Sequence, residues 1–141
     1  MLIQTKHHIV HLTAHVILVC KYRKKLLIRF GEEMKQLLQQ RADISKWFEI
    51  TTLEVDTDHV HMMIDYSPGE TVQNIVKQLK SYTAFHMWQN HPELKDQFWK
   101  QKMFWSTGYF ACSVGDASRE TIQKYIETQG TRPQIKRNIH P

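Results

Sequence analysis

The segment that most constrains the fold is residues 47–66, WFEITTLEVDTDHVHMMIDY, in which apolar and polar residues alternate. A period of two is typical of β-strands that bury one face. The alternation breaks near Thr57 and Asp58, which predicts a turn between two strands. This segment is therefore expected to form a β-hairpin, and the SPGE sequence that follows is expected to end it.

The remaining segments change from strand-like to helix-like periodicity in a regular order along the chain. Strands are expected within residues 11–23 and 108–114, and helices at residues 32–44, 71–90 and about 118–129. Gly31 is expected to mark the start of the first helix. The resulting order, β-α-β-β-α-β-α, predicts an α+β protein. Its expected fold is ferredoxin-like (RRM-like): an antiparallel four-stranded sheet with two packed helices, extended here by a C-terminal helix.

Length and composition are those of one domain with a substantial core, since 41% of the 141 residues are hydrophobic. We expect the domain to span residues 1–130 and a polar tail to follow at residues 131–141. No apolar run has membrane-spanning length and the chain does not begin like a signal peptide, so a cytoplasmic protein without a membrane partner is expected. Cys20 and Cys112 lack CxxC spacing and are expected to be buried thiols. The net charge of +5 favours an anionic partner.

Two histidines flank a valine in DHVHMMI, within the second strand of the expected hairpin. On a strand, residues two apart point to the same face, so His59 and His61 project together while Val60 points into the core. Two imidazoles side by side can offer lone pairs to one cation and would form half of a metal site. A chance pair of surface histidines is the alternative, and only a third ligand would decide between them.

The last helix offers such a ligand, because Tyr125 and Gln129 are four residues apart and share a helix face. An amide oxygen combined with imidazoles suits Mg²⁺ or Mn²⁺ and leaves positions for phosphate oxygens. A tyrosine beside such a metal is a candidate nucleophile toward a phosphodiester. Simple packing is the alternative, with Ile122, Tyr125, Ile126 and Gln129 forming the apolar face of the helix. The spacing alone leaves both interpretations open.

Five motifs spread along the chain resemble a single protein family. They are HVILVCKYRKKLL, DHVHMMI, IVKQLKSYT, FWSTGYFACSVG and YIETQ. Together they resemble the single-tyrosine HUH transposases of the IS200/IS605 type, which move bacterial and archaeal insertion sequences as single-stranded DNA, and the resemblance covers nearly the whole chain.

The resemblance implies roles for four residues and several partners. His59 and His61 would bind the metal, Gln129 would be its third ligand, and Tyr125 would be the nucleophile that forms a 5′-phosphotyrosine link to DNA. The implied ion is Mg²⁺, with Mn²⁺ as a possible substitute, and the implied substrate is single-stranded DNA with hairpin ends. A homodimer is also implied, in which the tyrosine helix of one subunit completes the histidine site of the other. No nucleotide cofactor is expected, in agreement with the absence of a GxxxxGK[ST] motif.

Two basic segments carry the candidate DNA-binding residues. They are Lys21, Arg23, Lys24 and Lys25 after the first strand, and Lys100 and Lys102 in FWKQKMFW. Their cations suit phosphates and the neighbouring aromatic rings suit unpaired bases, although an ordinary solvated loop is the alternative for the first segment. Three tryptophans are expected to pack in the core or at a dimer interface: Trp88, Trp99 and Trp105.

Two other functions stay open at this stage. A ferredoxin-like sheet is also the scaffold of non-catalytic RRM-like nucleic-acid-binding modules, but such a module would leave the histidine pair and the tyrosine unexplained. A related HUH nickase or a domesticated palindrome-processing enzyme would use the same residues on another target. The remaining histidines His7, His8, His11 and His15 are expected to be surface or structural residues, whereas Asp58 and Glu54 are candidates to orient an imidazole.

Overall fold

Four antiparallel strands form the sheet that organises the molecule, in the order β2-β3-β1-β4. The structure is a computed structural model that describes residues 12–98, 101–113 and 119–131. The strands are β1 (Leu12–Val19), β2 (Phe48–Val55), β3 (His59–Tyr66) and β4 (Phe110–Ser113). The helices are α1 (Leu27–Ile44), α2 (Val72–Asn90) and α3 (Arg119–Thr131), with short 3-10 turns η1 (Lys21–Arg23) and η2 (Pro92–Asp96). This confirms the predicted element order and the ferredoxin-like fold class.

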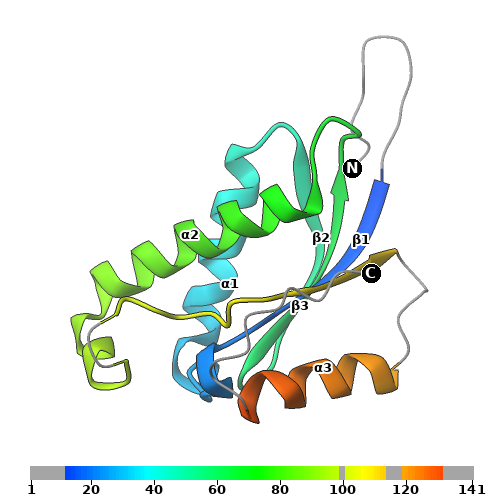
Figure 1. Cartoon of the computed structure of the whole chain (residues 1–141). Helices are drawn as coiled ribbons and strands as arrows, with labels where there is room; N and C mark the ends of the chain where they lie inside the picture. The colour runs from blue at the N-terminus through cyan, green and yellow to red at the C-terminus, as the bar shows by residue number, and fades with distance from the viewer. Residues whose placement is uncertain (1–11, 99–100, 114–118, 132–141) are drawn as a thin grey trace.

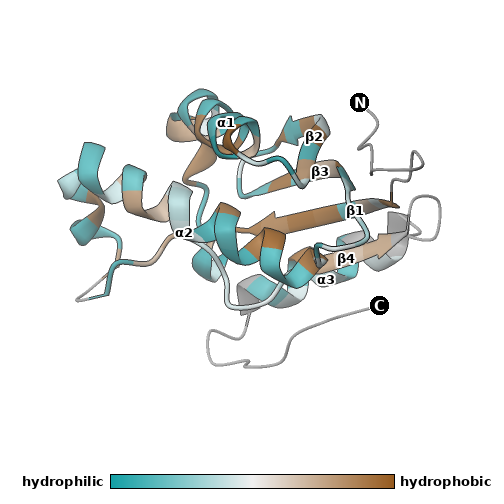
Figure 2. Cartoon of the chain, turned by 90° about the horizontal axis from the view of Figure 1, so that it is seen from above, coloured by the Kyte–Doolittle hydropathy of each residue, from teal (hydrophilic) through white to brown (hydrophobic). Residues whose placement is uncertain are grey.

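The helices cover both faces of the sheet. Figure 1 shows α1 and α2 on one face and α3 on the other, and the brown colour of β1 in Figure 2 shows that the strand between them is apolar. The alternation along β1 explains this arrangement, because Val16 and Leu18 belong to the main core while Ile17 and Val19 belong to a second, smaller core on the α3 side. Both faces of the central strand are therefore apolar, as a strand covered on two sides requires.

The hairpin has the predicted form, with β2 and β3 joined by a short turn at residues 56–58. The register sets His61 opposite Ile17 on β1 and opposite Glu54 on β2. Met62 and Ile64 of β3 face the main core, so the odd-numbered residues of this strand face the α3 side. The register thus decides which side chains meet around the two histidines.

The first helix differs from its predicted start. α1 begins at Leu27 instead of residue 32, because Leu27 and Phe30 are buried and extend the apolar face of the helix by more than a turn. Gly31 consequently lies inside the helix. A Cβ atom at Gly31 would lie 3.3 Å from Val55 Cγ1, so the glycine allows a close approach of α1 to the end of β2.

Several other predictions can be compared with the structure. Cys20 and Cys112 are buried free cysteines, as expected. The second helix starts as predicted, with the Thr71 hydroxyl accepting a hydrogen bond from the Asn74 N–H (3.1 Å). No helix within the described ranges is long and apolar enough to cross a bilayer. Ser118 and residues 132–141 of the predicted tail lie outside the described residues, so the domain boundary at residue 130 stays a prediction.

Candidate active site

The two histidines of DHVHMMI lie on the sheet face that α3 covers, and Val60 between them is fully buried in the main core. This confirms the predicted orientation of the three side chains. His59 Nε2 lies 3.0 Å from His61 Nε2, so the two rings direct these atoms toward each other. His59 is buried and His61 is half-buried, which makes this pair more enclosed than the exposed strand face that alternation alone suggested.

A carboxylate fixes the orientation of the first histidine. His59 Nδ1–H donates a hydrogen bond to Asp58 Oδ1 (2.8 Å), and a carboxylate can only accept here. Asp58 Oδ2 in turn lies 3.4 Å from Arg23 Nε of η1. The proton on Nδ1 leaves the His59 Nε2 lone pair available to a ligand. Asp58 therefore fills the orienting role that the sequence suggested for it.

A third histidine, His15, contacts the His61 ring. His15 Nε2 lies 3.3 Å from His61 Nδ1, and the ring centroids are 5.5 Å apart. Burial lowers the pKa of His61, with further lowering by His59 and His15 and opposing effects of Glu54 and Asp56. Burial also lowers the pKa of His15, against an opposing effect of Glu54. Sequence reasoning missed this contact, because it depends on the register of β1 against β3.

The geometry of the histidine pair fits a shared metal ion. Two ligands that lie about 2.1 Å from one octahedral ion at a right angle are about 3.0 Å apart, which matches the Nε2 separation of 3.0 Å, a distance that also suits a hydrogen bond between the rings. The exposed Asp56 adds a carboxylate oxygen 3.9 Å from His59 Nε2. Within the described ranges, no three His, Cys, Asp or Glu side chains form a metal-binding group, so Asp56 does not complete a metal site with the two histidines.

The tyrosine of α3 is buried against the same face of the sheet. Tyr125 is 4% exposed and packs beside Phe110 of β4, with ring centroids 5.9 Å apart. It shares the smaller core with Ile17 and Val19 of β1. Burial raises the pKa of Tyr125, and the neighbouring Tyr109 raises it further. The Tyr125 hydroxyl is fully buried and has no hydrogen-bond partner among the described residues.

Strand pairing connects the tyrosine with the histidines. Ile17 and Val19, which contact the tyrosine core, are the β-sheet partners of His61 and His59 respectively. Tyr125 therefore lies over the strand next to the histidine pair. The unpartnered hydroxyl and the converging imidazole nitrogens thus lie on one covered sheet face.

Two further residues of the α3 face are buried. Ile126 joins the smaller core, and Gln129 is 9% exposed, one turn beyond Tyr125. Three of the four residues that formed the alternative packing interpretation are therefore buried, and the side chain of the fourth, Ile122, lies outside the described part of the structure. α3 lies against η1, whose Arg23 contacts Asp58, as Figure 1 shows at the C-terminal end of the helix. Among the described residues Gln129 has no hydrogen bond to either histidine, so its role as a ligand stays a prediction.

The candidate DNA-binding residues have different surroundings. Lys21 lies over the Tyr22 ring (5.3 Å) and 3.5 Å from Thr107 Oγ1, and Lys24 lies over the Phe98 ring (5.9 Å). Arg23 is engaged with Asp58. Lys25 and Lys102 are exposed, and Lys100 lies outside the described residues.

The predicted packing role of Trp88 and Trp105 is confirmed by their partial or full burial and by hydrogen bonds to Met103 O (2.7 Å) and Thr83 Oγ1 (2.9 Å), whereas Trp99 is not described.

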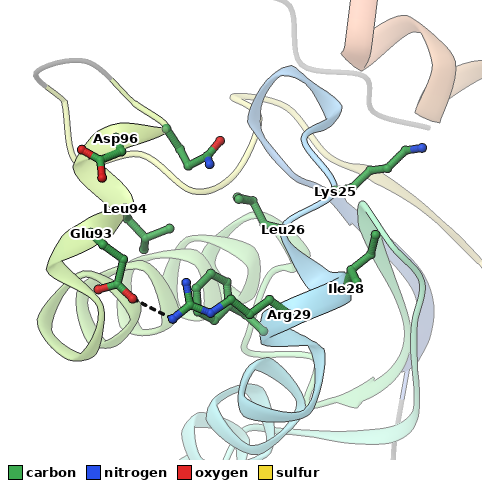
Figure 3. Close-up of a pocket in the computed structure, with 9 residues that line it drawn as sticks. Lys25, Leu26, Ile28, Arg29, Glu93, Leu94 and Asp96 are labelled. Atoms are coloured by element: carbon green, nitrogen blue, oxygen red, sulfur yellow. Dashed lines mark hydrogen bonds and ion pairs between the residues drawn. The ribbon is translucent and has the colours of Figure 1, made fainter.

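A groove of about 460 Å³ lies apart from the histidines, between the start of α1 and η2. Figure 3 shows Arg29 and Glu93 joined across it, with a nitrogen-to-oxygen distance of 2.8 Å. Lys25 points away from Glu93 in this view. The paired charges make the groove a weaker anion site than its basic residues alone would suggest.

Comparisons with known proteins place the chain in a family. A family model described as "Transposase IS200 like" matches residues 8–129. The ISDra2 transposase TnpA of Deinococcus radiodurans is 32% identical over 123 residues, covering 86% of each chain. The transposase for insertion sequence element IS200 of Salmonella typhimurium is 26% identical over 117 residues, which is 82% of this chain and 74% of that protein.

Two solved structures are similar to this fold. A Deinococcus radiodurans protein described as a transposase superposes with a TM-score of 0.79 at 30% identity, covering 89% of this chain and 96% of that one. A REP-associated tyrosine transposase bound to a REP hairpin superposes with a TM-score of 0.54 at 11% identity, over 88% of this chain and 68% of that one, and supports the fold alone.

The fold and the matches define a DNA-processing enzyme, a transposase. The chain belongs to the IS200-like transposase family. The alternative of a non-catalytic RRM-like module is thereby set aside.

Proposed function

We propose that this transposase cleaves and rejoins single-stranded DNA at the ends of an insertion sequence through a 5′-phosphotyrosine intermediate. One observation carries the proposal. The Nε2 atoms of His59 and His61 lie 3.0 Å apart on the sheet face against which α3 buries the unpartnered hydroxyl of Tyr125. A nucleophile and a pair of cation ligands on one face are what phosphodiester cleavage by a tyrosine needs.

Tyr125 would perform the cleavage step. Its Oη would attack the phosphorus, forming the Oη–P bond and breaking the bond from phosphorus to the 3′ oxygen. The phenol proton would leave to solvent and the departing 3′ oxygen would take up a proton. Because one phosphodiester replaces another, a 3′-OH can later reverse the step and rejoin DNA without a nucleotide cofactor.

The residues that would hold a divalent ion are His59, His61 and Gln129. When bound, Mg²⁺ or Mn²⁺ supplies positive charge that stabilises the phosphate oxygens as charge develops on them. Asp58 would keep His59 in the ligating tautomer. Imidazoles together with oxygen donors suit these hard ions better than a thiolate site would.

Single-stranded DNA with hairpin ends is the proposed substrate. The net charge of +5 favours a polyanion, and the exposed Lys25 and Lys102 are the described candidates with ammonium groups open to solvent. Phe85 is 63% exposed and lines a hollow with Trp88 and Lys102, so bases could stack beside a cation there. A structural neighbour with this fold has a REP hairpin bound, which supports the choice of a hairpin as test substrate.

A homodimer with active sites completed in trans is the proposed assembly. With α3 packed on its own sheet, the Tyr125 hydroxyl is inaccessible to DNA, so the helix must move before the tyrosine can attack. Among the described residues, the apolar contact that it would leave comprises Tyr125 and Ile126 on four sheet residues, and α3 would also leave η1. The second copy offers the same surfaces, so an exchange of helices between subunits would remake these contacts.

The test uses single-stranded oligonucleotides that carry the end hairpins of the element, incubated with the protein in Mg²⁺ or EDTA. The expected result is an SDS-resistant protein–DNA adduct that needs Mg²⁺ and disappears in Tyr125→Phe. Tyr82→Phe is the matched control, because this tyrosine lies on α2 away from the site and should leave the adduct unchanged. An adduct that persists in Tyr125→Phe would refute the assignment of the nucleophile.

The trans arrangement has its own test. Tyr125→Phe and the double variant His59→Ala/His61→Ala should each be inactive, and a mixture of the two should form adduct, because one composite site per mixed dimer retains both parts. An inactive mixture, with subunit exchange verified by differently tagged chains, would show that each subunit uses its own tyrosine.

A further inference from the structure

We propose that His15 is a positioning residue that holds the His61 ring so that its Nε2 atom faces the metal ion. The inference rests on the proposed function, because it assumes that His59 and His61 share an ion. His15 belongs to β1, and the strand register makes it a diagonal neighbour of His61, since His15 pairs with Met63 and Ile17 pairs with His61. Both side chains project from the sheet face that α3 covers.

The position of His15 excludes a role as a third ligand of the same ion. Its Nε2 atom lies 3.3 Å from Nδ1 of His61, whereas the ion would lie at Nε2 of that ring. The two nitrogens of an imidazole direct their bonds away from each other, so a group hydrogen-bonded to one cannot reach a ligand at the other. His15 thus contacts Nδ1 of His61, the ring atom that faces away from the ion, as Asp58 contacts Nδ1 of His59.

The two orienting groups differ in chemistry. Asp58 only accepts a hydrogen bond and keeps His59 Nδ1 protonated. A neutral imidazole can either donate or accept, depending on its tautomer. Without an ion, His61 Nε2–H can donate to His59 Nε2 while its Nδ1 accepts from His15. With an ion bound, His61 must carry its proton on Nδ1, and His15 Nε2 can accept it.

His15 can therefore satisfy the His61 ring in both states without a rotation of either side chain. A carboxylate at this position could serve only the ion-bound state. An apolar residue could serve neither state and would leave His61 Nδ1 without a partner on a covered sheet face. The expected consequence is a ring that is aligned before the ion arrives.

The experiment is a titration of the purified full chain with Mn²⁺, in which electron paramagnetic resonance measures the free ion. His15→Leu removes both hydrogen-bonding functions and should weaken Mn²⁺ affinity by about 10–100-fold, the usual effect of losing a residue that orients a ligand. His15→Gln keeps a donor and an acceptor near the same position and should stay within about threefold of the wild type. Rescue by glutamine separates hydrogen bonding from simple packing.

His86→Leu is the matched control, because it is the same substitution on α2, where His86 packs against Tyr82 and Phe85. It should leave Mn²⁺ affinity unchanged. Thermal unfolding in EDTA checks that each variant folds, and His15→Ala replaces His15→Leu if the latter does not. Wild-type affinity in the folded leucine or alanine variant would overturn the inference, as would equal losses in the glutamine and leucine variants. A wild-type protein that binds no Mn²⁺ would instead overturn the metal site of the proposed function, and this inference with it.

Discussion

Replacing Tyr125 by phenylalanine should stabilise the protein. The Tyr125 hydroxyl is buried and unpartnered among the described residues, while its ring packs beside Phe110. A buried polar group without a hydrogen bond costs about 1–3 kcal/mol. Because phenylalanine keeps the ring and removes only the hydroxyl, we expect the free energy of unfolding to rise by about 1 kcal/mol. For a chain of this size that corresponds to an increase of about 3–5 °C in Tm.

The stabilisation by Tyr125→Phe should increase at alkaline pH. Burial raises the pKa of Tyr125 in the folded state, whereas the unfolded tyrosine titrates near its ordinary pKa of about 10. The folded protein therefore holds this proton more tightly than the unfolded chain does. The contribution of the neutral phenol to stability is complete below pH about 10 and declines as the pH rises above it. Phenylalanine has no proton to lose, so the difference between variant and wild type should widen above pH 10.

Urea unfolding followed by circular dichroism measures both effects, at pH 7.5 and pH 10.5, in EDTA and at a fixed protein concentration. Tyr82→Phe is the control, because the Tyr82 hydroxyl donates to Gln40 Oε1 (3.3 Å) and its loss should be neutral or slightly destabilising. A Tyr125→Phe variant that is less stable than the wild type at pH 7.5 would refute the reasoning, since it would mean that the hydroxyl has a favourable partner. A residue whose removal stabilises the fold and abolishes the adduct is typical of a functional site.

Three further predictions follow from named contacts. Asp58→Ala should weaken Mn²⁺ affinity by about 10–100-fold in the same resonance titration, because His59 loses the acceptor of its Nδ1 proton. Lys80→Met should lower the free energy of unfolding by about 2–3 kcal/mol in urea, because Lys80 Nζ donates to the carbonyls of residues 106, 107 and 108 at 2.7, 3.1 and 2.8 Å. Lys25→Gln should weaken hairpin binding and reduce the slope of log affinity against log salt by about 1 in fluorescence anisotropy.

Two of these predictions have a contrasting control variant. Asp58→Asn keeps an acceptor oxygen and should lose less Mn²⁺ affinity than the alanine variant. Lys77 lies on the exposed side of the same helix as Lys80, so Lys77→Met should leave the free energy of unfolding within about 0.5 kcal/mol of the wild type. An unchanged salt slope in Lys25→Gln would mean that this lysine makes no phosphate contact.

Local periodicity was sufficient to predict the fold. The alternation of residues 47–66 places Val60 in the main core and both histidines on the opposite face, as the structure has them. The predicted start of α1 was wrong. Gly31 was interpreted as the helix boundary, whereas it lies inside the helix and allows close packing against Val55. A glycine inside a helix and a glycine at its end have the same local sequence signal, and only the tertiary contact separates them.

The supporting residues of the site could not be predicted in the same way. His15 lies 46 positions from His61 in the chain, and their contact exists only because β1 and β3 pair in one particular register. Arg23 lies with its Nε atom 3.4 Å from Asp58 Oδ2, a contact that the basic segment did not predict, and its binding to DNA stays a prediction. The residues that carry the chemistry form short local patterns, whereas those that orient them come from distant strands and turns. A single sequence shows the local patterns directly, whereas the orienting contacts can be identified only once the fold is known.

In the proposed mechanism, the small core beneath α3 would also set how often Tyr125 is available for attack. Docking of α3 buries Tyr125 and Ile126 but leaves one hydroxyl unpaired, so the cost of that hydroxyl opposes the gain from apolar burial. Tighter docking would make the undocked helix rarer and slow the proposed reaction, and looser docking would expose an apolar sheet face. The strength of this contact would therefore influence the rate of the proposed cleavage separately from the chemistry of the site.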